Sequence, residues 1–135
     1  TYDLVIEPDQ LEISKDVQAL IIRTLPNELA KKSMNYSNTN PVYLDVKCAQ
    51  KTIDAGIDHL LVDLPSVDKE KDGGELLAHN AFWNTAGEIR MDATITEFIY
   101  VSNKVNDGEY LLNLMIAPFE NDATPSKPIL YEILS

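Results

Sequence analysis

Residues 45–63 read DVKCAQKTIDAGIDHLLVD, a helix pattern that runs directly into a strand pattern. Asp45 is a favoured residue for capping a helix N-terminus, and Gly56 stands where a left-handed residue ends many helices. Between them, apolar residues recur at helical spacing, at Val46, Ala49 and Ile53. The pattern predicts a helix over residues 46–55 and then a strand over residues 59–63. The consecutive apolar residues of that strand are typical of a strand covered on both faces.

Outward from this segment, five more aliphatic or β-branched runs are candidate strands, namely residues 4–6, 19–23, 94–101, 110–119 and 129–134. With the run before it, the central segment forms a strand-helix-strand unit, which indicates the α/β class. Residues 94–99 alternate polar and apolar side chains, so the sheet is predicted to be mixed.

A second helix is predicted over residues 75–82. Asp107-Gly108 predicts a hairpin turn between the runs on either side of it, and the polar stretch 31–41 is a long loop that we expect near a site.

Composition and charge exclude several classes of partner. The chain has 135 residues, the size of one domain, and its 22 acidic and 11 basic residues give a net charge of −11. The cations are scattered, which disfavours nucleic acids and anionic membranes as partners. No apolar run approaches the ~20 residues that span a bilayer. Cys48 is the only cysteine, so any metal must be held by His, Asp or Glu, and we expect Cys48 to be an inert buried thiol.

Two histidines and one carboxylate are the candidate chemical groups. His59, at the edge of the buried strand, is expected to form hydrogen bonds with its neighbours in a structural role. His79 lies on the second predicted helix, and it is either a solvated or core histidine or a ligand. Glu97 stands in an apolar strand and must face water, a partner charge or a metal, because burying a lone carboxylate is costly. Trp83 either packs in the core or lines an aromatic pocket.

Five blocks of sequence, in this order, resemble the C-terminal two thirds of the cyclase/kynurenine formamidase-like family of metal-dependent hydrolases. They are GIDHLLVDLPSVD (56–68), LAH (77–79), ITE (95–97), DGEYLL (107–112) and DATPSKPIL (122–130). The segment ALIIRT (19–24) is similar to the family strand that precedes a substrate-side loop. The resemblance covers nearly the whole chain. The members of the family include bacterial kynurenine formamidases, isatin hydrolases and some polyketide cyclases.

The resemblance implies a swivelling β/β/α domain whose site holds one or two divalent metals, usually zinc or manganese. It implies that His79 is a metal ligand and that Glu97 is a ligand able to bridge two ions. The loop from Asp63 to Asp68 is similar to the family's signature loop beside the site. Residues expected around the metal or on the substrate side are Asp63, Ser66, Asp68 and Trp83.

The chain departs from the family pattern in one important way. The family motif His-x-x-x-His-x-Asp, and a further His that transfers protons, are absent from the 135 residues. We expect these residues before Thr1, which would make the chain a single cyclase-family domain (residues 1–135) whose N-terminal part is missing. A catalytic zinc usually has three protein ligands, so we expect the isolated chain to be inactive and to bind metal weakly.

For the full-length protein the resemblance implies hydrolysis of an amide bond, in an aryl formamide or a cyclic amide. A polyketide-type cyclase or dehydratase of the same family is one alternative, and a non-catalytic binding module that kept the fold is the other. The expected partners are a small-molecule substrate and further copies of the chain, as a homodimer or larger oligomer, with no nucleic acid and no membrane. The expected location is the cytoplasm, with secretion left open because the N-terminal part is expected to be missing.

Overall fold

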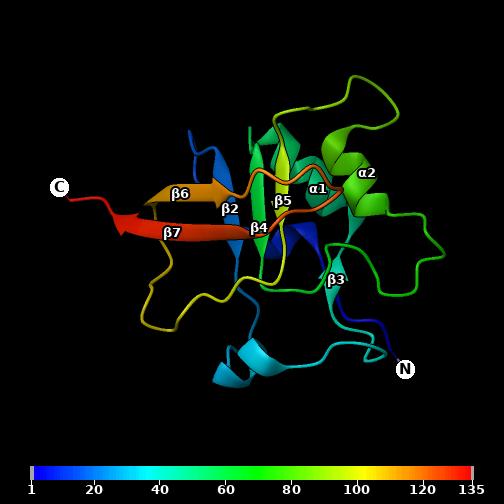
Figure 1. The fold of residues 1–135 in the computed structure, drawn as a ribbon, viewed down its shortest axis with the longest axis horizontal. Coiled ribbons are helices and arrows are strands. Elements are labelled where there is room, and N and C mark those ends of the chain that lie inside the picture. The colour runs from blue at the N-terminus through cyan, green and yellow to red at the C-terminus, as the bar shows by residue number, and fades with distance from the viewer. Residues whose placement is uncertain (1, 135) are drawn as a thin grey trace. The chain divides into compact units, whose positions relative to one another are not determined.

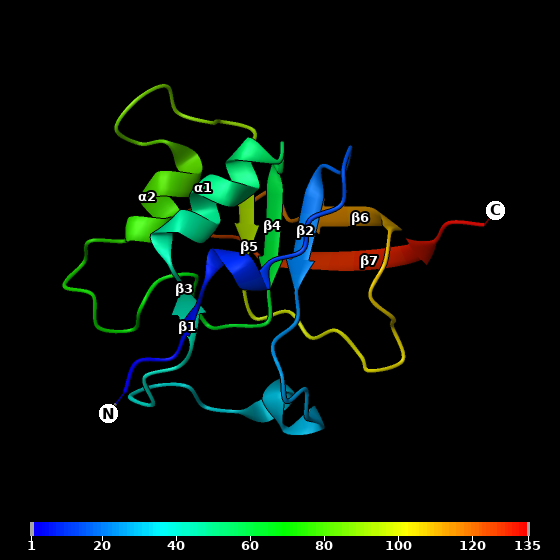
Figure 2. The same ribbon diagram turned by 180° about the vertical axis from the view of Figure 1, so that it is seen from behind.

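The strand-helix-strand unit predicted from residues 19–63 is present at the centre of the structure, a computed structural model that describes residues 2–134. Its strands are β2 (Ala19–Ile22) and β4 (His59–Val62), and α1 (Val46–Asp54) lies between them in sequence. β5 (Thr94–Thr96) completes a parallel sheet in the order β2-β4-β5. Figures 1 and 2 show these three strands side by side, with α1 and α2 (Leu77–Trp83) next to them. The α/β class is confirmed.

The ends of α1 follow the sequence pattern. The Asp45 side chain accepts a hydrogen bond of 2.8 Å from Lys47 N, and Gly56 adopts φ +80° just past the helix. The predicted face is confirmed in part, because Ala49 is buried and Ile53 packs against the core, whereas Val46 is exposed. Cys48 and Thr52, which were not predicted on this face, are buried as well. Burial raises the pKa of the Cys48 thiol to about 11, as expected of an inert cysteine.

The main hydrophobic core lies between the helices and one face of the sheet. It contains Leu60 and Val62 of β4 together with Phe82 and Ala78 of α2, and Ile95 of β5 packs against it. Since side chains alternate along a strand, Leu60, Val62 and Ile95 define the helix-covered face of the sheet. His59, on the opposite face, has its Nδ1 2.9 Å from Thr94 Oγ1, in the structural role expected of it.

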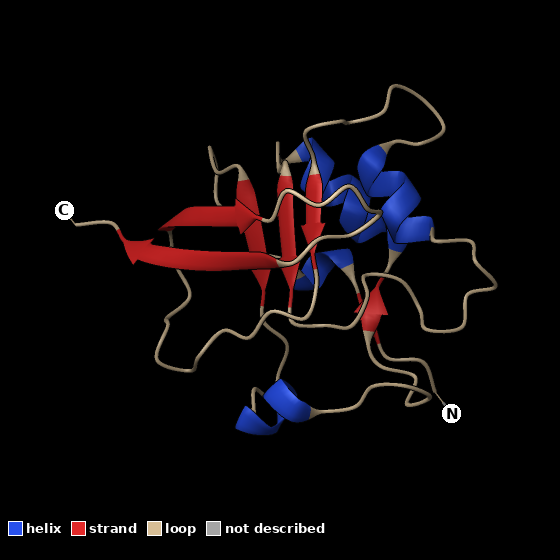
Figure 3. Cartoon of the chain, in the orientation of Figure 1, coloured by secondary structure: helices blue, strands red, loops and turns tan. Residues whose placement is uncertain are grey.

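Two smaller pairs of strands accompany this sheet. β1 (Val5–Ile6) and β3 (Tyr43–Leu44) form a short parallel pair, and 3₁₀ helices cover Pro8–Gln10 (η1) and Leu29–Ser33 (η2). The chain divides into two compact units, the first ending at Asn103 and the second beginning at Lys104. The second unit is an antiparallel hairpin of β6 (Tyr110–Ile116) and β7 (Ser126–Glu132), drawn in red with the other strands in Figure 3.

Several predicted elements differ from the structure. Parallel and antiparallel pairs lie in separate sheets and not in one mixed sheet. The strand predicted over 94–101 ends at Thr96, because Phe98 adopts φ +57°. The hairpin predicted around Asp107-Gly108 is wrong, since β5 pairs with β4 and β6 pairs with β7. The strand β3 was not predicted. Among the described residues, no helix combines the length and the apolar character required to cross a membrane.

Candidate functional site

His79 lies between two carboxylates on the helix-covered side of the sheet. Its Nδ1 is 2.7 Å from Asp68 Oδ2, and its Nε2 is 3.4 Å from Glu97 Oε1. The imidazole is only 16% exposed. Three segments far apart in sequence therefore meet at one ring: the loop after β4, the helix α2 and the residue that follows β5.

Asp68 owes its position to the start of α2. Leu76, the residue just before the helix, has φ +48°, and its side chain makes no capping hydrogen bond. The Asp68 carboxylate accepts hydrogen bonds from Ala78 N at 2.6 Å and His79 N at 3.2 Å, so it supplies the missing cap from elsewhere in the chain. Ser66 Oγ accepts a bond from Asp68 N at 3.1 Å and holds the loop in place. Asp68 thus positions both the helix and the ring of His79.

Glu97 faces the same site because of the alternation of β5. Ile95 packs against the helix-side core, and Glu97 is two residues further along. Its Oε1 accepts a hydrogen bond of 3.1 Å from Val67 N, in the same loop that carries Asp68. Glu97 therefore holds the loop at Val67, and the next residue of the loop, Asp68, binds the ring of His79.

The two carboxylates dominate the electrostatics of the ring. Burial by itself would lower the pKa of His79, but the hydrogen bonds to Asp68 and Glu97 outweigh it and raise the pKa to about 9. Burial would likewise raise the pKa of Asp68, but the hydrogen bonds from His79 and Ala78 hold it below its ordinary value of 3.8. The site therefore favours positive charge between Asp68 and Glu97.

Trp83 is another predicted site residue that lies here. Its ring centroid is 5.2 Å from that of His79, with the planes inclined at 45°, and its Nε1 donates to Ala93 O at 3.0 Å. The indole is partly buried against the core. It packs beside His79 and limits the rotation of that ring.

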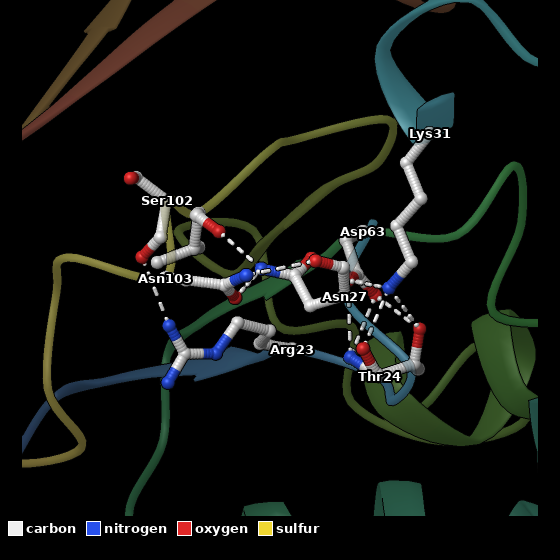
Figure 4. Close-up of polar contacts among 8 residues, drawn as sticks. Arg23, Thr24, Asn27, Lys31, Asp63, Ser102 and Asn103 are labelled. Carbon is white, nitrogen blue, oxygen red and sulfur yellow. Dashed lines mark hydrogen bonds and ion pairs between the residues drawn. The ribbon is translucent and has the colours of Figure 1, made fainter. Parts of the chain in front are cut away.

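Asp63 is not part of this group. Its carboxylate accepts bonds from Thr24 N and Thr24 Oγ1, and it forms an ion pair of 2.9 Å with Lys31 Nζ. Figure 4 shows Lys31 reaching from η2 toward Thr24 and Asp63, with Arg23, Asn27, Ser102 and Asn103 close by. Asp63 follows Val62, so alternation directs it away from the face that carries the core. Thr24 and Lys31 were not predicted from sequence, although a carboxylate ending a buried strand requires partners of this kind.

Two hollows in the surface lie elsewhere. One is lined by residues including Asp58, Arg90 and Met91, and the other by residues including Asn40 and Glu70. Neither includes His79 or Glu97. The candidate site is marked by its polar contacts.

His79 and Glu97 fit two positions around a divalent metal. Two ligand atoms about 2.1 Å from one tetrahedral ion lie roughly 3.4 Å apart, which matches the distance from Nε2 to Oε1. A metal-binding His usually donates its other N–H to a carboxylate, as Asp68 would accept it here. Imidazole with carboxylate suits both zinc and manganese. No group of three or more such ligands occurs within residues 2–134.

Two solved structures are similar to this chain over nearly its whole length. One is a potential metal-dependent hydrolase with cyclase activity, with a TM-score of 0.69 and 15% identity over 96% of this chain and 59% of that one. The other is a predicted metal-dependent hydrolase from Bacillus stearothermophilus, with a TM-score of 0.63 and 16% identity over 95% of this chain and 62% of that one. The chain has the fold of these two proteins.

At such identities the likeness establishes the fold alone. The chain spans 59% and 62% of the two structures that it matches. No family model matches the sequence, and no curated protein matches it either. The likeness supports the coarse hydrolase/cyclase-like fold that the sequence blocks implied, and the kynurenine formamidase-like assignment stays a prediction.

Proposed function

We propose that the full-length protein is a metal-dependent hydrolase in which His79 and Glu97 hold a divalent metal, zinc or manganese. The observation that carries this proposal is the 3.4 Å separation of His79 Nε2 and Glu97 Oε1, with the other ring nitrogen held by Asp68. The fold likeness to two proteins described as metal-dependent hydrolases supports it.

Each residue of the site has a distinct part in this proposal. A bound divalent ion would act as a Lewis acid and lower the pKa of water. With a metal bound, Asp68 would accept a hydrogen bond from Nδ1–H of the neutral ring and so leave the lone pair of Nε2 for the ion. Glu97 supplies negative charge, and its bond to Val67 N limits its rotation. Trp83 holds the plane of the imidazole.

We further propose that the remaining ligands lie outside these 135 residues, because the described part of the chain offers fewer than three. The same observation favours one rival from another class, a non-catalytic binding module that kept the fold. The sequence of the full-length protein separates the two. A His-x-x-x-His-x-Asp motif elsewhere in it supports the enzyme, and its absence supports the module.

The substrate proposed is an amide, either an aryl formamide or a cyclic amide, as the sequence resemblance implies. The alternative is a cyclase or dehydratase, because one of the two similar structures is described as having cyclase activity. Assaying hydrolysis of N-formylkynurenine and isatin by the full-length protein distinguishes them. Turnover of either compound supports the amidohydrolase, and turnover of neither contradicts these two substrates.

We also propose that the protein is a homodimer or larger homo-oligomer. One face of the β6–β7 hairpin exposes Leu111, Met115 and Tyr131. Exposed apolar patches of this kind often mark association surfaces. Light scattering coupled to size-exclusion chromatography measures the mass directly, and a monomer at every concentration would contradict this proposal.

The metal content of the full-length protein tests the site itself. We expect His79→Ala and Glu97→Ala each to lower the zinc or manganese bound per chain, by at least about tenfold at limiting metal. His59→Ala is the matched control, since His59 contacts Thr94 and not the site. Unchanged metal content in both site variants would rule out the assignment.

A further inference from the structure

The pairing of β5 with β4 slips by one residue immediately after Glu97. Thr94 N donates to Asp58 O at 2.9 Å, one residue before its register partner His59. Repeating that pattern every two residues would make Phe98 N donate to Val62 O. Instead, Ile99 N donates to Val62 O at 3.2 Å. One extra residue is therefore inserted between Thr96 and Ile99, as in a β-bulge.

Phe98 makes this insertion possible through its backbone. Its φ is +57°, a left-handed conformation that glycine and asparagine adopt readily and that large side chains rarely do. In this conformation Phe98 N turns to Leu64 O, at 2.9 Å. The neighbouring Glu97 carboxylate accepts the bond from Val67 N. Adjacent residues thus bind both ends of the loop from Leu64 to Val67.

The ring of Phe98 does not explain the conformation by burial. The residue is 66% exposed, and its ring contacts that of Tyr36 at a centroid distance of 6.1 Å. An exposed ring contributes little core packing that could offset an unfavourable backbone. Strained backbone of this kind is found preferentially at functional sites, where the surroundings hold it.

We propose that Phe98 is a positioning residue for the candidate site, whose left-handed backbone lets Glu97 and the loop from Leu64 to Asp68 hold each other in place. The proposal deepens the proposed function and rests on it, because Glu97 is one of the two ligands. Phe98 acts through its backbone: its amide binds Leu64 O while the Glu97 carboxylate binds Val67 N, and the loop held in this way brings Asp68 to His79. The ring itself is dispensable for this role.

Substitutions at position 98 separate the backbone from the ring. Phe98→Gly and Phe98→Asn remove the ring but favour φ near +57°, whereas Phe98→Val and Phe98→Ile keep an apolar side chain and disfavour it. The first readout is hydrogen exchange of the Val67 amide in the metal-free protein, followed by NMR and divided by the rate of the Thr94 amide. Thr94 is the internal control, since its amide bonds to Asp58 O at the other end of β5.

We expect the Val67 ratio in the Gly and Asn variants to stay within about threefold of wild type, and in the Val and Ile variants to rise by about tenfold. Faster exchange in Gly and Asn than in Val and Ile would overturn the proposal, because it would show that an apolar side chain matters and the left-handed backbone does not. Equal exchange in all four would overturn it too. Should Val and Ile fail to fold, a tenfold rise in the Gly variant alone still overturns it.

A second readout keeps this inference distinct from the metal assignment. Zinc affinity of the full-length protein, measured by competition with a chelator, is expected to fall about tenfold in Phe98→Val and to be unchanged in Phe98→Gly. If the Val67 amide follows the expected order while wild type binds no zinc, the positioning role stands and the proposed function fails. If zinc binds but both variants bind it like wild type, the positioning role fails and the function stands.

Discussion

The imidazole of His79 is the most constrained side chain of the candidate site. Asp68 lies at one ring nitrogen and Glu97 at the other, and Trp83 lies beside the ring. Two carboxylates around one ring require a positive charge between them, which either a proton on the ring or a metal ion supplies. In the metal-free protein that charge is the proton, since the pKa of His79 is about 9.

This charge predicts a dependence of stability on pH. The pKa of His79 is raised from 6.5 to about 9 on folding, so its stabilising contribution is complete below about pH 6.5 and is lost as the pH rises through about 9. For the metal-free protein, we expect the difference in free energy of unfolding between wild type and His79→Gln to shrink by up to about 3 kcal/mol between about pH 6 and about pH 10. Urea denaturation across this range measures it. A difference that stays constant with pH would contradict the role of the two carboxylates.

At the level of residues, sequence reasoning paired His79 with Glu97 through the family resemblance, and the structure brings their side chains together. Sequence reasoning also predicted Asp63 beside them, but in the structure Asp63 binds Thr24 and Lys31 instead. The alternation of β4 explains this difference, because in the structure Leu60 and Val62 face the helices and Asp63 therefore cannot. Nothing local to Asp68 indicates that it caps a helix ten residues later.

Among the secondary-structure elements, α2 depends on a residue outside itself. The Asp68 carboxylate accepts hydrogen bonds from the Ala78 and His79 amides, which lie in the first turn and have no acceptor within the helix. We expect Asp68→Ala to lower the free energy of unfolding by about 2 kcal/mol, as the loss of a helix cap with an added charge-assisted bond. Chemical denaturation measures it. Ser66→Ala removes one bond in the same loop and is the control, with an expected loss under about 1 kcal/mol; equal losses would contradict the capping role.

The 3₁₀ helix η2 is fastened to the sheet by one buried ion pair. Lys31 Nζ bonds to Asp63, whose side chain is 0% exposed, and to Thr24 O. We expect Lys31→Met to cost about 3 kcal/mol of stability, because it leaves the Asp63 charge buried without a counter-ion.

Lys32→Met is the matched control for this ion pair. Lys32 is exposed and lies 4.9 Å from the centroid of the Tyr100 ring, a contact worth about 1 kcal/mol or less. Thermal and urea unfolding of both variants give the comparison. Similar losses from the two substitutions would show that the buried pair contributes no more than a surface contact.

In the molecule as a whole, the second unit consists of a single hairpin. A two-stranded hairpin is at best marginally stable alone in water, and here Leu111, Met115 and Tyr131 are exposed. We expect a peptide of residues 104–135 to show no cooperative thermal transition by circular dichroism. The intact chain, measured in parallel, should show one. A sigmoidal transition in the peptide would mean that the hairpin folds independently.

The sequence by itself determined the elements whose signals are local. The cap at Asp45, the stop at Gly56 and the apolar run of β4 specify α1 and its strand, because propensity and periodicity act between residues a few positions apart. The single cysteine likewise restricted the possible metal ligands to His, Asp and Glu. Only the tertiary structure decided that β6 pairs with β7, that β5 slips at Phe98, that Asp68 serves α2 and that Asp63 binds Lys31. Each of these depends on which distant segments meet when the whole chain closes its loops and buries its core, and no local window contains that information.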